Sequence, residues 1–453
     1  MKTEGTPITR TACSLTFIFA ISAYAQHSAA AQAPGAESGG PAARSAGEYG
    51  RPKLPPPYAT PSAIHFSKVI GWPEGKTPVA PPGFKVTLYA DRLDYPRWLF
   101  VLPNGDVLVA EARTEPKQKG ESGQDEFERG MIESATVGKS ANRITLLRDA
   151  NHDGVPELRS VFLTGLNQQM GMALRGDTFY VANTDGVVVF PYRTGETQIT
   201  AKGRKILELP AGGYNNHWNR NLLFKPDGNK LYIAVGSDSN VGEHGMEKER
   251  RRAGILEVNP DGSGERVYAS GLRNPQGLDF EPVTGALWTA VNERDELGDE
   301  LVPDFITSVR EGGFYGWPYS YFGQHEDPRR KGERPDLVAK AIVPDYAVGA
   351  HTASLGLAFY KGTAFPEAYR GGAFVGQHGS WNRSILAGYK VLFVPFKDGK
   401  PNGPAQDFLT GFIAGEGKRE VYGRPVGLAA LPDGSLLVAD DAGGKIWRVS
   451  AVR

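Results

Sequence analysis

One local pattern recurs along this chain. A turn rich in Pro, Asn, Asp and Gly is followed by a short apolar or β-branched run, which ends at a polar residue. Turn residues followed by such a run are typical of β-hairpins. Five copies are plain, and a sixth copy with an expanded turn covers 354–379. The five are LPNGDVLVAEA at 102–112, LRGDTFYVANTDG at 174–186, KPDGNKLYIAVGSD at 225–238, EPVTGALWTAVNE at 281–293 and LPDGSLLVADDAGG at 431–444.

Six copies of one strand unit favour a radial repeat over a β-sandwich, the alternative all-β architecture. Neighbouring blades of a propeller cover each other's sheets and leave few open edges. The 57 Gly and 33 Pro residues agree with many short strands and turns. The units are about 50 to 75 residues apart, so loops must be inserted between strands. We therefore predict an all-β, six-bladed β-propeller in which the last strand, at 445–450, closes the ring with the earliest strand.

The first 60 residues differ from the rest in composition. Residues 1–25 are typical of a secretory signal, with Lys2 and Arg10 before and at the start of an apolar run and small residues at the end. That run is too short to span a bilayer. Residues 26–60 are rich in Ala, Gly, Pro and Ser and predict a disordered linker. The propeller domain is then expected at 61–453, in a protein that is periplasmic or secreted.

Cysteine content and charge exclude several classes of function. The single cysteine, Cys13, lies inside the predicted signal, so the mature chain would carry no disulfide, zinc–thiolate site, cysteine nucleophile or iron–sulfur cluster. The motif for covalent haem is also absent. Fifty-one basic and 51 acidic residues balance, so no nucleic-acid partner is expected. No amphipathic stretch suggests stable membrane insertion.

Polar residues of different kinds lie at the ends of the predicted strands. His217 precedes one strand and Asp238 ends the next, so the carboxylate could orient the imidazole as a base or bind a group beside it. A histidine satisfied within a turn is the alternative. Arg273 and Asn274 precede Pro275, which restricts Asn274 to extended geometry and aims both side chains. Arg273 could grip a carboxylate or serve as a structural contact between blades.

Two further arginines occupy similar positions. Arg424 precedes a proline and an apolar strand in the last repeat, and Arg383 follows Trp381 in GQHGSWNRS. Together with Arg273, they place three cations on separate blades. This arrangement suits a polyanionic ligand at the hub of a propeller. His351 and His378 also flank strands and could line the same hub.

Two acidic stretches offer oxygen ligands for calcium. The first, at 292–300, is either a solvated charged loop or a calcium site. The second, at 149–157, resembles a calcium loop but has Ser160 where a distal glutamate would be needed, so a hairpin turn is preferred. The carboxylates of the first stretch are Glu293, Asp295, Glu296, Asp299 and Glu300.

Three longer phrases carry a resemblance to a known family. They are NNHWNRNLLFKPDG at 215–228, SGLRNPQGLDFEP at 270–282 and DELVPDFITSVREGGFYGWP at 299–318. In this order and spacing they resemble the secreted quinoprotein sugar dehydrogenases of the soluble glucose dehydrogenase and sorbosone dehydrogenase type. The resemblance spans about 90 to 450. It implies a six-bladed propeller that binds pyrroloquinoline quinone (PQQ) and calcium in a central well.

The resemblance also implies roles for single residues. His217 matches the family's catalytic base, and Asp238 matches an aspartate that closes the next strand. The cofactor-binding positions match Gln169, with Gln168 as the rival, and Arg273, Asn274 and Arg424. Arg383 stands where the family has a lysine, and Tyr346 or Trp381 could stack on the quinone.

For calcium, the resemblance implies two sets of ligands. The cofactor's calcium would be held largely by backbone carbonyls of a loop that aligns with Arg294 and Asp295. A second, structural calcium would use Asp299, Glu300 and Tyr315.

The predicted function is PQQ-dependent oxidation of an aldose, a sugar aldehyde or a related alcohol. Calcium would make the quinone carbonyl electrophilic as a Lewis acid. Because no haem is encoded, the electrons would leave to an external acceptor, such as a soluble cytochrome or a quinone. The alternatives are a metal-dependent lactonase or other hydrolase, and a propeller that binds a glycan or protein without catalysis.

Overall fold

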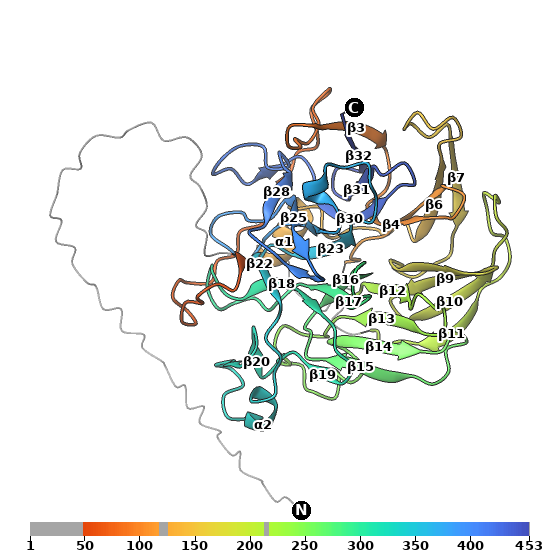
Figure 1. Ribbon diagram of the computed structural model, residues 1–453. Helices are drawn as coiled ribbons and strands as arrows, with labels where there is room; N and C mark the ends of the chain where they lie inside the picture. Colours follow the sequence, from red (N-terminus) through yellow and green to blue (C-terminus); the bar gives the residue numbers. More distant parts are fainter. Residues whose placement is uncertain (1–48, 117–125, 213–216, 453) are drawn as a thin grey trace, which may run out of the picture. The chain divides into compact units, whose positions relative to one another are not determined.

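The computed structural model describes residues 49–116, 126–212 and 217–452. The predicted signal at 1–25 and the first part of the predicted linker, 26–48, lie outside the described residues. Within the described ranges, six sheets of four or five strands follow one another around a ring (Figure 1). The predicted six-bladed β-propeller is confirmed. No helix among these residues is both long enough and apolar enough to cross a membrane.

Each blade contains a four-stranded antiparallel sheet in which the chain runs from the inner strand outward, except that the outermost strand of blade 6 comes from the start of the propeller sequence. Blade 1 comprises β4 (Pro96–Val101), β5 (Val107–Glu111), β6 (Arg143–Arg148) and β7 (Leu158–Leu163). Blade 2 comprises β8 (Met172–Arg175), β9 (Thr178–Asn183), β10 (Gly186–Pro191) and β11 (Arg204–Glu208). Blade 3 comprises β12 (Arg220–Phe224), β13 (Leu231–Val235), β14 (Gly254–Val258) and β15 (Arg266–Ser270), with β19 (Gly313–Phe314) added at its edge.

The other three blades repeat this order. Blade 4 comprises β16 (Pro275–Phe280), β17 (Leu287–Val291), β18 (Pro303–Ser308) and β22 (Tyr346–Ala350), with β1 (Tyr49–Gly50) added at its edge. Blade 5 comprises β23 (Ser354–Phe359), β24 (Ala373–Gln377), β25 (Lys390–Val394) and β28 (Gln406–Leu409). Blade 6 comprises β30 (Pro425–Ala430), β31 (Leu436–Asp440), β32 (Lys445–Ala451) and β3 (Phe84–Ala90).

Small elements fill the connections between these strands. Three two-stranded pairs occur among the described residues, together with two short helices and a single 3₁₀ turn. The pairs are β2 (Lys68–Val69) with β29 (Glu420–Val421), β20 (Ser320–Tyr321) with β21 (His325–Glu326), and β26 (Phe396–Lys397) with β27 (Lys400–Pro401). The helical segments are α1 (Glu126–Glu133), α2 (Pro335–Val338) and the 3₁₀ turn η1 (Glu367–Tyr369).

The repeated sequence unit corresponds to the second strand of each blade. In five of the six blades this strand is buried along its whole length, because sheets pack against both of its faces. That is why its sequence is a continuous apolar run rather than an alternating one. The turn before it joins it to the inner strand, as the hairpin pattern predicted.

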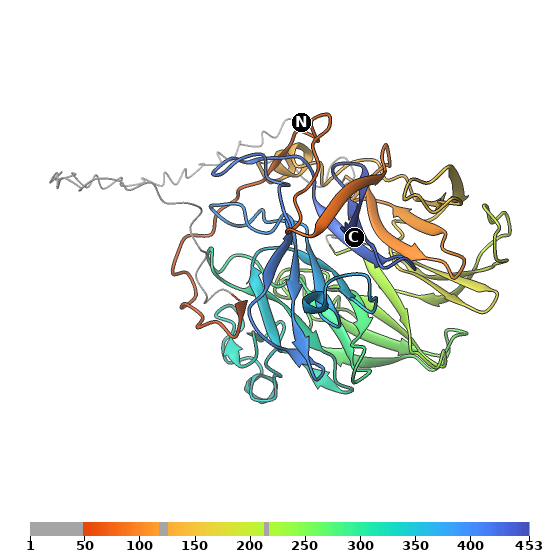
Figure 2. The same ribbon diagram turned by 45° about the horizontal axis from the view of Figure 1, so that its top comes forward.

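The ring closes by pairing of distant strands. In blade 6 the last strand, β32, lies between β31 and β3, and Val86 pairs with Val449. Figure 2 shows the orange β3 beside the dark blue end of the chain. The predicted closure of the ring by the last strand is confirmed.

Glycines allow the inner strands to approach one another. A Cβ added at Gly356 of β23 would lie 2.1 Å from the carbonyl oxygen of Val426 in β30. One added at Gly427 of β30 would lie 2.8 Å from the carbonyl oxygen of Arg97 in β4. Side chains at these two positions would push blades 5, 6 and 1 apart.

Residues 49–72 form a strap that packs on the propeller. Tyr49 pairs with Val348 through β1 and β22, and the amide of Tyr58 donates to the carbonyl of Leu297 at 2.8 Å. Further along, β2 pairs with β29. The linker boundary predicted at residue 60 therefore lies too late. Composition indicated a linker because the partners of this segment are more than 200 residues away in sequence.

Candidate functional site

A cavity near the propeller axis collects polar side chains from five blades. Most of them lie just before or after blade strands, as the sequence predicted, and Arg97 lies near the start of β4. The strap and helix α1 also contribute to its lining. The lining includes Arg97, His217, Arg273, Asn274, Asp295, His351, His378 and Arg424. Three of the predicted residues, His217, Arg273 and Arg424, therefore share one cavity although they precede strands of different blades.

His217 is held by Ser237. Its Nδ1 lies 3.0 Å from the Ser237 carbonyl oxygen and 3.0 Å from Ser237 Oγ. Because Ser237 Oγ donates to the Ser239 carbonyl, both atoms near the ring act as acceptors, so Nδ1 carries the proton. Nε2 then has a free lone pair, and it has no partner within the described part of the chain. Burial, followed by the positive charge of Arg273, lowers the pKa of His217 well below its usual 6.5.

Asp238 does not contact His217, so the predicted partner of the imidazole is corrected to Ser237. The Asp238 carboxylate accepts from His244 Nδ1 at 2.9 Å and faces Arg252 at 3.7 Å. Asp238 is also outside the cavity lining. Successive side chains of an extended segment point in opposite directions, so Ser237 faces the ring and Asp238 faces away from it.

Arg273 organises the loop that follows β17. All five of its N–H groups are used: they donate to Asn240, to the carbonyls of Asn292 and Glu293, and to Asp295 Oδ2 at 3.1 Å. No N–H group is left to grip a ligand carboxylate in the predicted bidentate way. Arg273 can still contribute its positive charge to the cavity.

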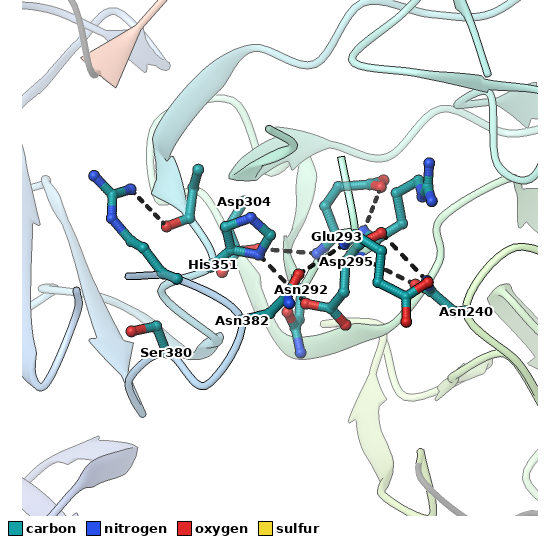
Figure 3. A network of polar contacts seen from close by, with 12 residues as sticks. Asn240, Asn292, Glu293, Asp295, Asp304, His351, Ser380 and Asn382 are labelled. Atoms are coloured by element: carbon teal, nitrogen blue, oxygen red, sulfur yellow. Dashed lines mark hydrogen bonds and ion pairs between the residues drawn. The ribbon is translucent and has the colours of Figure 1, made fainter. Parts of the chain in front are cut away.

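Asp295 and His351 extend this network (Figure 3). Asp295 Oδ1 lies 3.3 Å from His351 Nδ1, and the Gly298 carbonyl lies 2.8 Å from His351 Nε2. An acceptor at each ring nitrogen favours the protonated form of His351. Burial lowers the pKa of His351, but the hydrogen bonds and charge of Asp295 outweigh burial and hold it above 6.5. The Asp295 carboxylate thus lies between the Arg273 guanidinium and the His351 ring.

Asn274 lies beside His217 because a glycine separates them. A Cβ added at Gly236 would lie 2.3 Å from Asn274 Oδ1 and 2.6 Å from His217 Cβ. Asn274 Oδ1 accepts from Gln276 Nε2 at 2.5 Å. Its Nδ2 group is the part that can donate to a ligand. His217 and Asn274 therefore both approach the Gly236 backbone.

Arg424 connects the propeller to its two covering segments. Its Nη1 donates to Thr136 Oγ1 at 3.0 Å, and its Nη2 donates to Ser67 Oγ at 3.1 Å and to the Ser134 carbonyl. Only 4% of the residue's surface is exposed. These partners are neutral, so the positive charge of Arg424 is not neutralised by a carboxylate.

Arg97 is the cavity arginine that sequence reasoning missed. It is the second residue of β4 and donates to Asp441 Oδ2 at 2.6 Å. The sequence contained a signal for Arg97, because Tyr-Pro-Arg at 95–97 has the same pattern of a central proline between two polar residues as Asn-Pro-Gln at 274–276. In both phrases the residues on either side of the proline line the cavity.

Gln169 and Arg383 are not in the cavity lining. Gln169 is fully buried and donates to the backbone carbonyls of Glu111 and Arg143 in blade 1. Its rival, Gln168, donates to the Arg113 carbonyl and is not in the lining either. Arg383 donates to the Asp299 carbonyl and pairs with Glu300 at 2.5 Å. In this structure these side chains hold neighbouring backbone and loop segments, and their predicted contacts with the cofactor stay predictions.

The predicted calcium ligands do not assemble through their side chains. Asp299 accepts from Ser384, Glu300 pairs with Arg383, and the Tyr315 hydroxyl donates to the Ser308 carbonyl at 2.5 Å. The Arg294 side chain is buried against Asp327. Within the described ranges, no three His, Cys, Asp or Glu side chains are placed to hold a metal ion. The backbone-carbonyl part of the calcium prediction, at Arg294 and Asp295, stays a prediction.

The 149–157 segment is the turn between β6 and β7, as the hairpin interpretation held. Its side chains bond to its own backbone: Asp149 accepts from the amides of Asp153 and Gly154. Of the two aromatic candidates, Trp381 lines the cavity. Tyr346 is outside that lining, and its hydroxyl donates to the Gly403 carbonyl.

The cavity is electropositive in a chain with no net charge. Its charged lining consists of three arginines and one aspartate, and Asp441 pairs with Arg97 just outside the lining. The lining also contains aromatic residues, among them Phe66, Tyr95 and Trp218. Cationic groups beside flat aromatic surfaces suit a planar anion.

Comparison with known proteins gives the family. Residues 180–382 match the model of a family described as glucose/sorbosone dehydrogenase, and residues 332–452 match one described as TrAA12-like. Aldose sugar dehydrogenase YliI of Escherichia coli is 28% identical over 177 residues, which are 35% of this chain and 45% of that protein. The PQQ domain of pyranose dehydrogenase from Coprinopsis cinerea, in its holo form, has a similar fold. It superposes with a TM-score of 0.65 at 21% identity, over 85% of this chain and 100% of that one.

A longer match supports the assignment. An uncharacterized protein of Borreliella burgdorferi is 31% identical over 295 residues, which are 63% of this chain and 76% of that protein. With the propeller, the polar cavity and the matching family model, the assignment follows: the chain belongs to the glucose/sorbosone dehydrogenase family.

Proposed function

We propose that this protein binds PQQ in the central cavity and oxidises an aldose, a sugar aldehyde or a related alcohol. The observation that carries the proposal is the pairing of two features in one cavity. Three guanidinium groups supply positive charge, and His217 presents an unprotonated nitrogen beside them. The relatives support the same chemistry, because they include an aldose sugar dehydrogenase and the PQQ domain of a pyranose dehydrogenase.

The residues fit a planar polyanion. The carboxylates of PQQ require cations, and the cavity carries an excess of arginine over acidic side chains. Arg424 bonds neutral groups, so ligand oxygens can replace its hydroxyl partners without breaking an ion pair. Asn274 Nδ2 can donate to a carbonyl oxygen. Arg273 acts through its charge, because its N–H groups are already bonded.

PQQ, when bound, accepts the two electrons that leave the substrate carbon. The protein's own part is to remove the hydroxyl proton. His217 takes this proton at Nε2, while Nδ1–H remains bonded to Ser237. A lowered pKa keeps the imidazole neutral, and therefore able to accept a proton, at neutral pH. The positive charge of Arg273 stabilises the negative charge that develops on the substrate oxygen.

No step is assigned to calcium. The side chains expected to bind it are engaged with Ser384, Arg383 and the Ser308 carbonyl. A calcium titration of the reconstituted protein tests the carbonyl-bound ion separately. Cofactor binding that is unchanged by a chelator would remove the metal from the proposal.

We also propose a periplasmic or secreted location and an external electron acceptor, such as a soluble cytochrome or a quinone. The charged and apolar pattern of residues 1–25 supports the location. The absence of a covalent haem motif in the sequence supports a separate acceptor.

The test is an absorbance titration with PQQ, followed by dye reduction with a panel of aldoses and aldehydes. We expect saturable binding in the wild type. The His217→Gln variant should bind PQQ equally well but lose turnover by about 100-fold or more, in line with loss of a general base. His325→Gln, outside the cavity lining, is the matched control.

Each arm can fail separately. A flat titration with PQQ would refute the cofactor and favour a propeller that only binds. Full turnover in His217→Gln would refute the base. Lactone hydrolysis without any quinone would favour the hydrolase alternative.

A further inference from the structure

A third imidazole lines the cavity besides His217 and His351, and it takes no part in the proposed proton transfer. His378 follows β24 in blade 5, and its Nε2 lies 2.8 Å from Asp441 Oδ2, which follows β31 in blade 6. Arg97 of blade 1 lies 2.6 Å from the same carboxylate oxygen. The three side chains are at least 90% buried. Three blades therefore meet at one carboxylate oxygen beside the cavity.

This arrangement selects the tautomer of His378. An ionised carboxylate only accepts hydrogen bonds, so a contact of 2.8 Å requires the proton to be on Nε2. Arg97 Nη1 lies 3.2 Å from the same nitrogen and donates to Asp441 at 2.6 Å; because the contact of Nε2 with the ionised carboxylate is the shorter of its two, that contact places the proton on Nε2. The pKa of Asp441 is held at about 2: burial raises it, but the charges of His378, Arg97 and Arg424 lower it further. Asp441 therefore stays ionised at neutral pH.

The remaining ring nitrogen is an available acceptor. With the proton on Nε2, the lone pair of His378 lies on Nδ1, which has no partner among the residues that the structure describes. Burial and the nearby Arg424 and Arg97 lower the pKa of His378 to about 4, against the opposing charge of Asp441. At neutral pH this nitrogen accepts a hydrogen bond without taking the proton. The surrounding arginines can only donate hydrogen bonds, whereas His378 Nδ1 can accept one.

We propose that His378 Nδ1 determines substrate specificity by accepting a hydrogen bond from a sugar hydroxyl that does not react. Asp441 and Arg97 are positioning residues that hold the ring in the required tautomer. The inference rests on the proposed function and narrows its substrate class to polyhydroxylated compounds. A substrate without that hydroxyl leaves Nδ1 without a donor in a buried wall, and such sites discriminate strongly.

The kinetic test uses the aldohexose that the wild type oxidises fastest and its monodeoxy derivatives. We expect one deoxy sugar to lose about 10-fold to 100-fold in kcat/KM with the wild type. His378→Leu should reduce that ratio to about twofold or less, with PQQ binding unchanged. His378→Asn should restore part of it, because its amide oxygen can take the place of Nδ1. If His378→Leu keeps the wild-type discrimination, the inference is wrong.

A spectroscopic test does not need turnover. In histidine-labelled protein, long-range proton–nitrogen NMR should show His378 as a neutral ring protonated at Nε2 at pH 7. Added sugar should shift the Nδ1 resonance, and Asp441→Asn should mix the tautomers. A ring protonated at Nδ1, or no shift with any sugar, overturns the inference.

The two proposals can fail independently. If no sugar is oxidised but Nδ1 still responds to sugar, the dehydrogenase proposal fails and the binding role of His378 stands. His244→Leu is the matched control. It removes a histidine that also pairs with an aspartate, at 2.9 Å, but lies outside the cavity lining. It should leave both the discrimination and the His378 signal unchanged.

Discussion

His217 is the residue on which the proposed chemistry depends, and two small neighbours set its position. Ser237 fixes the proton on Nδ1 through two contacts of 3.0 Å. Gly236 has no Cβ at the point where His217 and Asn274 both approach its backbone. The base is thus placed by residues that take no part in proton transfer themselves.

Gly236→Ala tests this close approach. The added Cβ would meet Asn274 Oδ1 at 2.3 Å and His217 Cβ at 2.6 Å, so both side chains must move. We expect kcat/KM to fall by about 10-fold to 100-fold, since misplacement of about an ångström has effects of this size. Gly415→Ala is the control, because there the added Cβ meets only the flexible Lys418 side chain, at 3.2 Å. Equal activities of the two variants would refute the steric argument.

Ser237→Ala tests how the His217 ring is held, and the pH dependence of kcat/KM tests the protonation state of that ring. The neutral His217 ring is the active form, and its pKa lies below 6.5. We therefore expect kcat/KM to rise with pH only below pH 6.5 and to gain nothing more from His217 at higher pH. The variant keeps the carbonyl contact and loses one hydrogen bond, worth about 0.5–1.5 kcal/mol, so turnover should fall roughly 2-fold to 12-fold. Ser160→Ala, whose hydroxyl donates to the Thr197 carbonyl outside the cavity lining, should leave the profile unchanged. An acid limb above pH 6.5 would contradict the assignment.

At the scale of elements, the cavity is covered by segments that belong to no blade. Phe66 of the strap stacks on Trp381, with ring centroids 5.6 Å apart, and Phe127 of α1 contacts Trp381 edge-on at 5.0 Å. The strap is anchored by Trp72, whose Nε1 donates to Asp440 Oδ2 at 2.6 Å. Asp440 also accepts from the Arg424 amide, so the anchor and the cavity arginine share one carboxylate.

Trp72→Phe should loosen the strap. It keeps an aromatic ring against Phe412 and Trp447 but removes a donor from a buried carboxylate, which costs about 1–3 kcal/mol. We expect a lower melting temperature and faster proteolysis within 49–72. Tyr58→Phe, an exposed strap residue held by its backbone amide, is the control. If the rate of proteolysis within 49–72 is unchanged in Trp72→Phe, Trp72 does not anchor the strap.

At the scale of the whole propeller, one strand joins the two ends of the ring. β32 lies between β31 and β3 and buries Ile446, Trp447 and Val449 almost completely. Each such side chain contributes roughly 1.5–3 kcal/mol, so together they approach a domain's net stability of about 5–15 kcal/mol. Closure therefore affects all blades at once.

Truncation after Asp440 should abolish cooperative unfolding and PQQ binding together. It removes β32 and leaves β3 without its partner. Truncation after Ala451 is the matched control, because it keeps the whole strand and loses the Val452 amide contact to Gly83. Circular dichroism melts and the PQQ titration measure both effects. A cooperative melt in the shorter chain would show that the ring does not need this closure.

Local sequence determined the blades, because the turn and the buried strand after it are encoded within about a dozen residues. It also placed His217, Arg273 and Arg424 at strand ends, and all three line one cavity. The tertiary structure decided which neighbours face that cavity: Ser237 rather than Asp238 contacts the base, and Arg97 rather than Arg383 lines the wall. Adjacent residues of an extended chain point in opposite directions. Which direction faces the axis depends on how six separate sheets pack around it, and no short stretch of sequence carries that information.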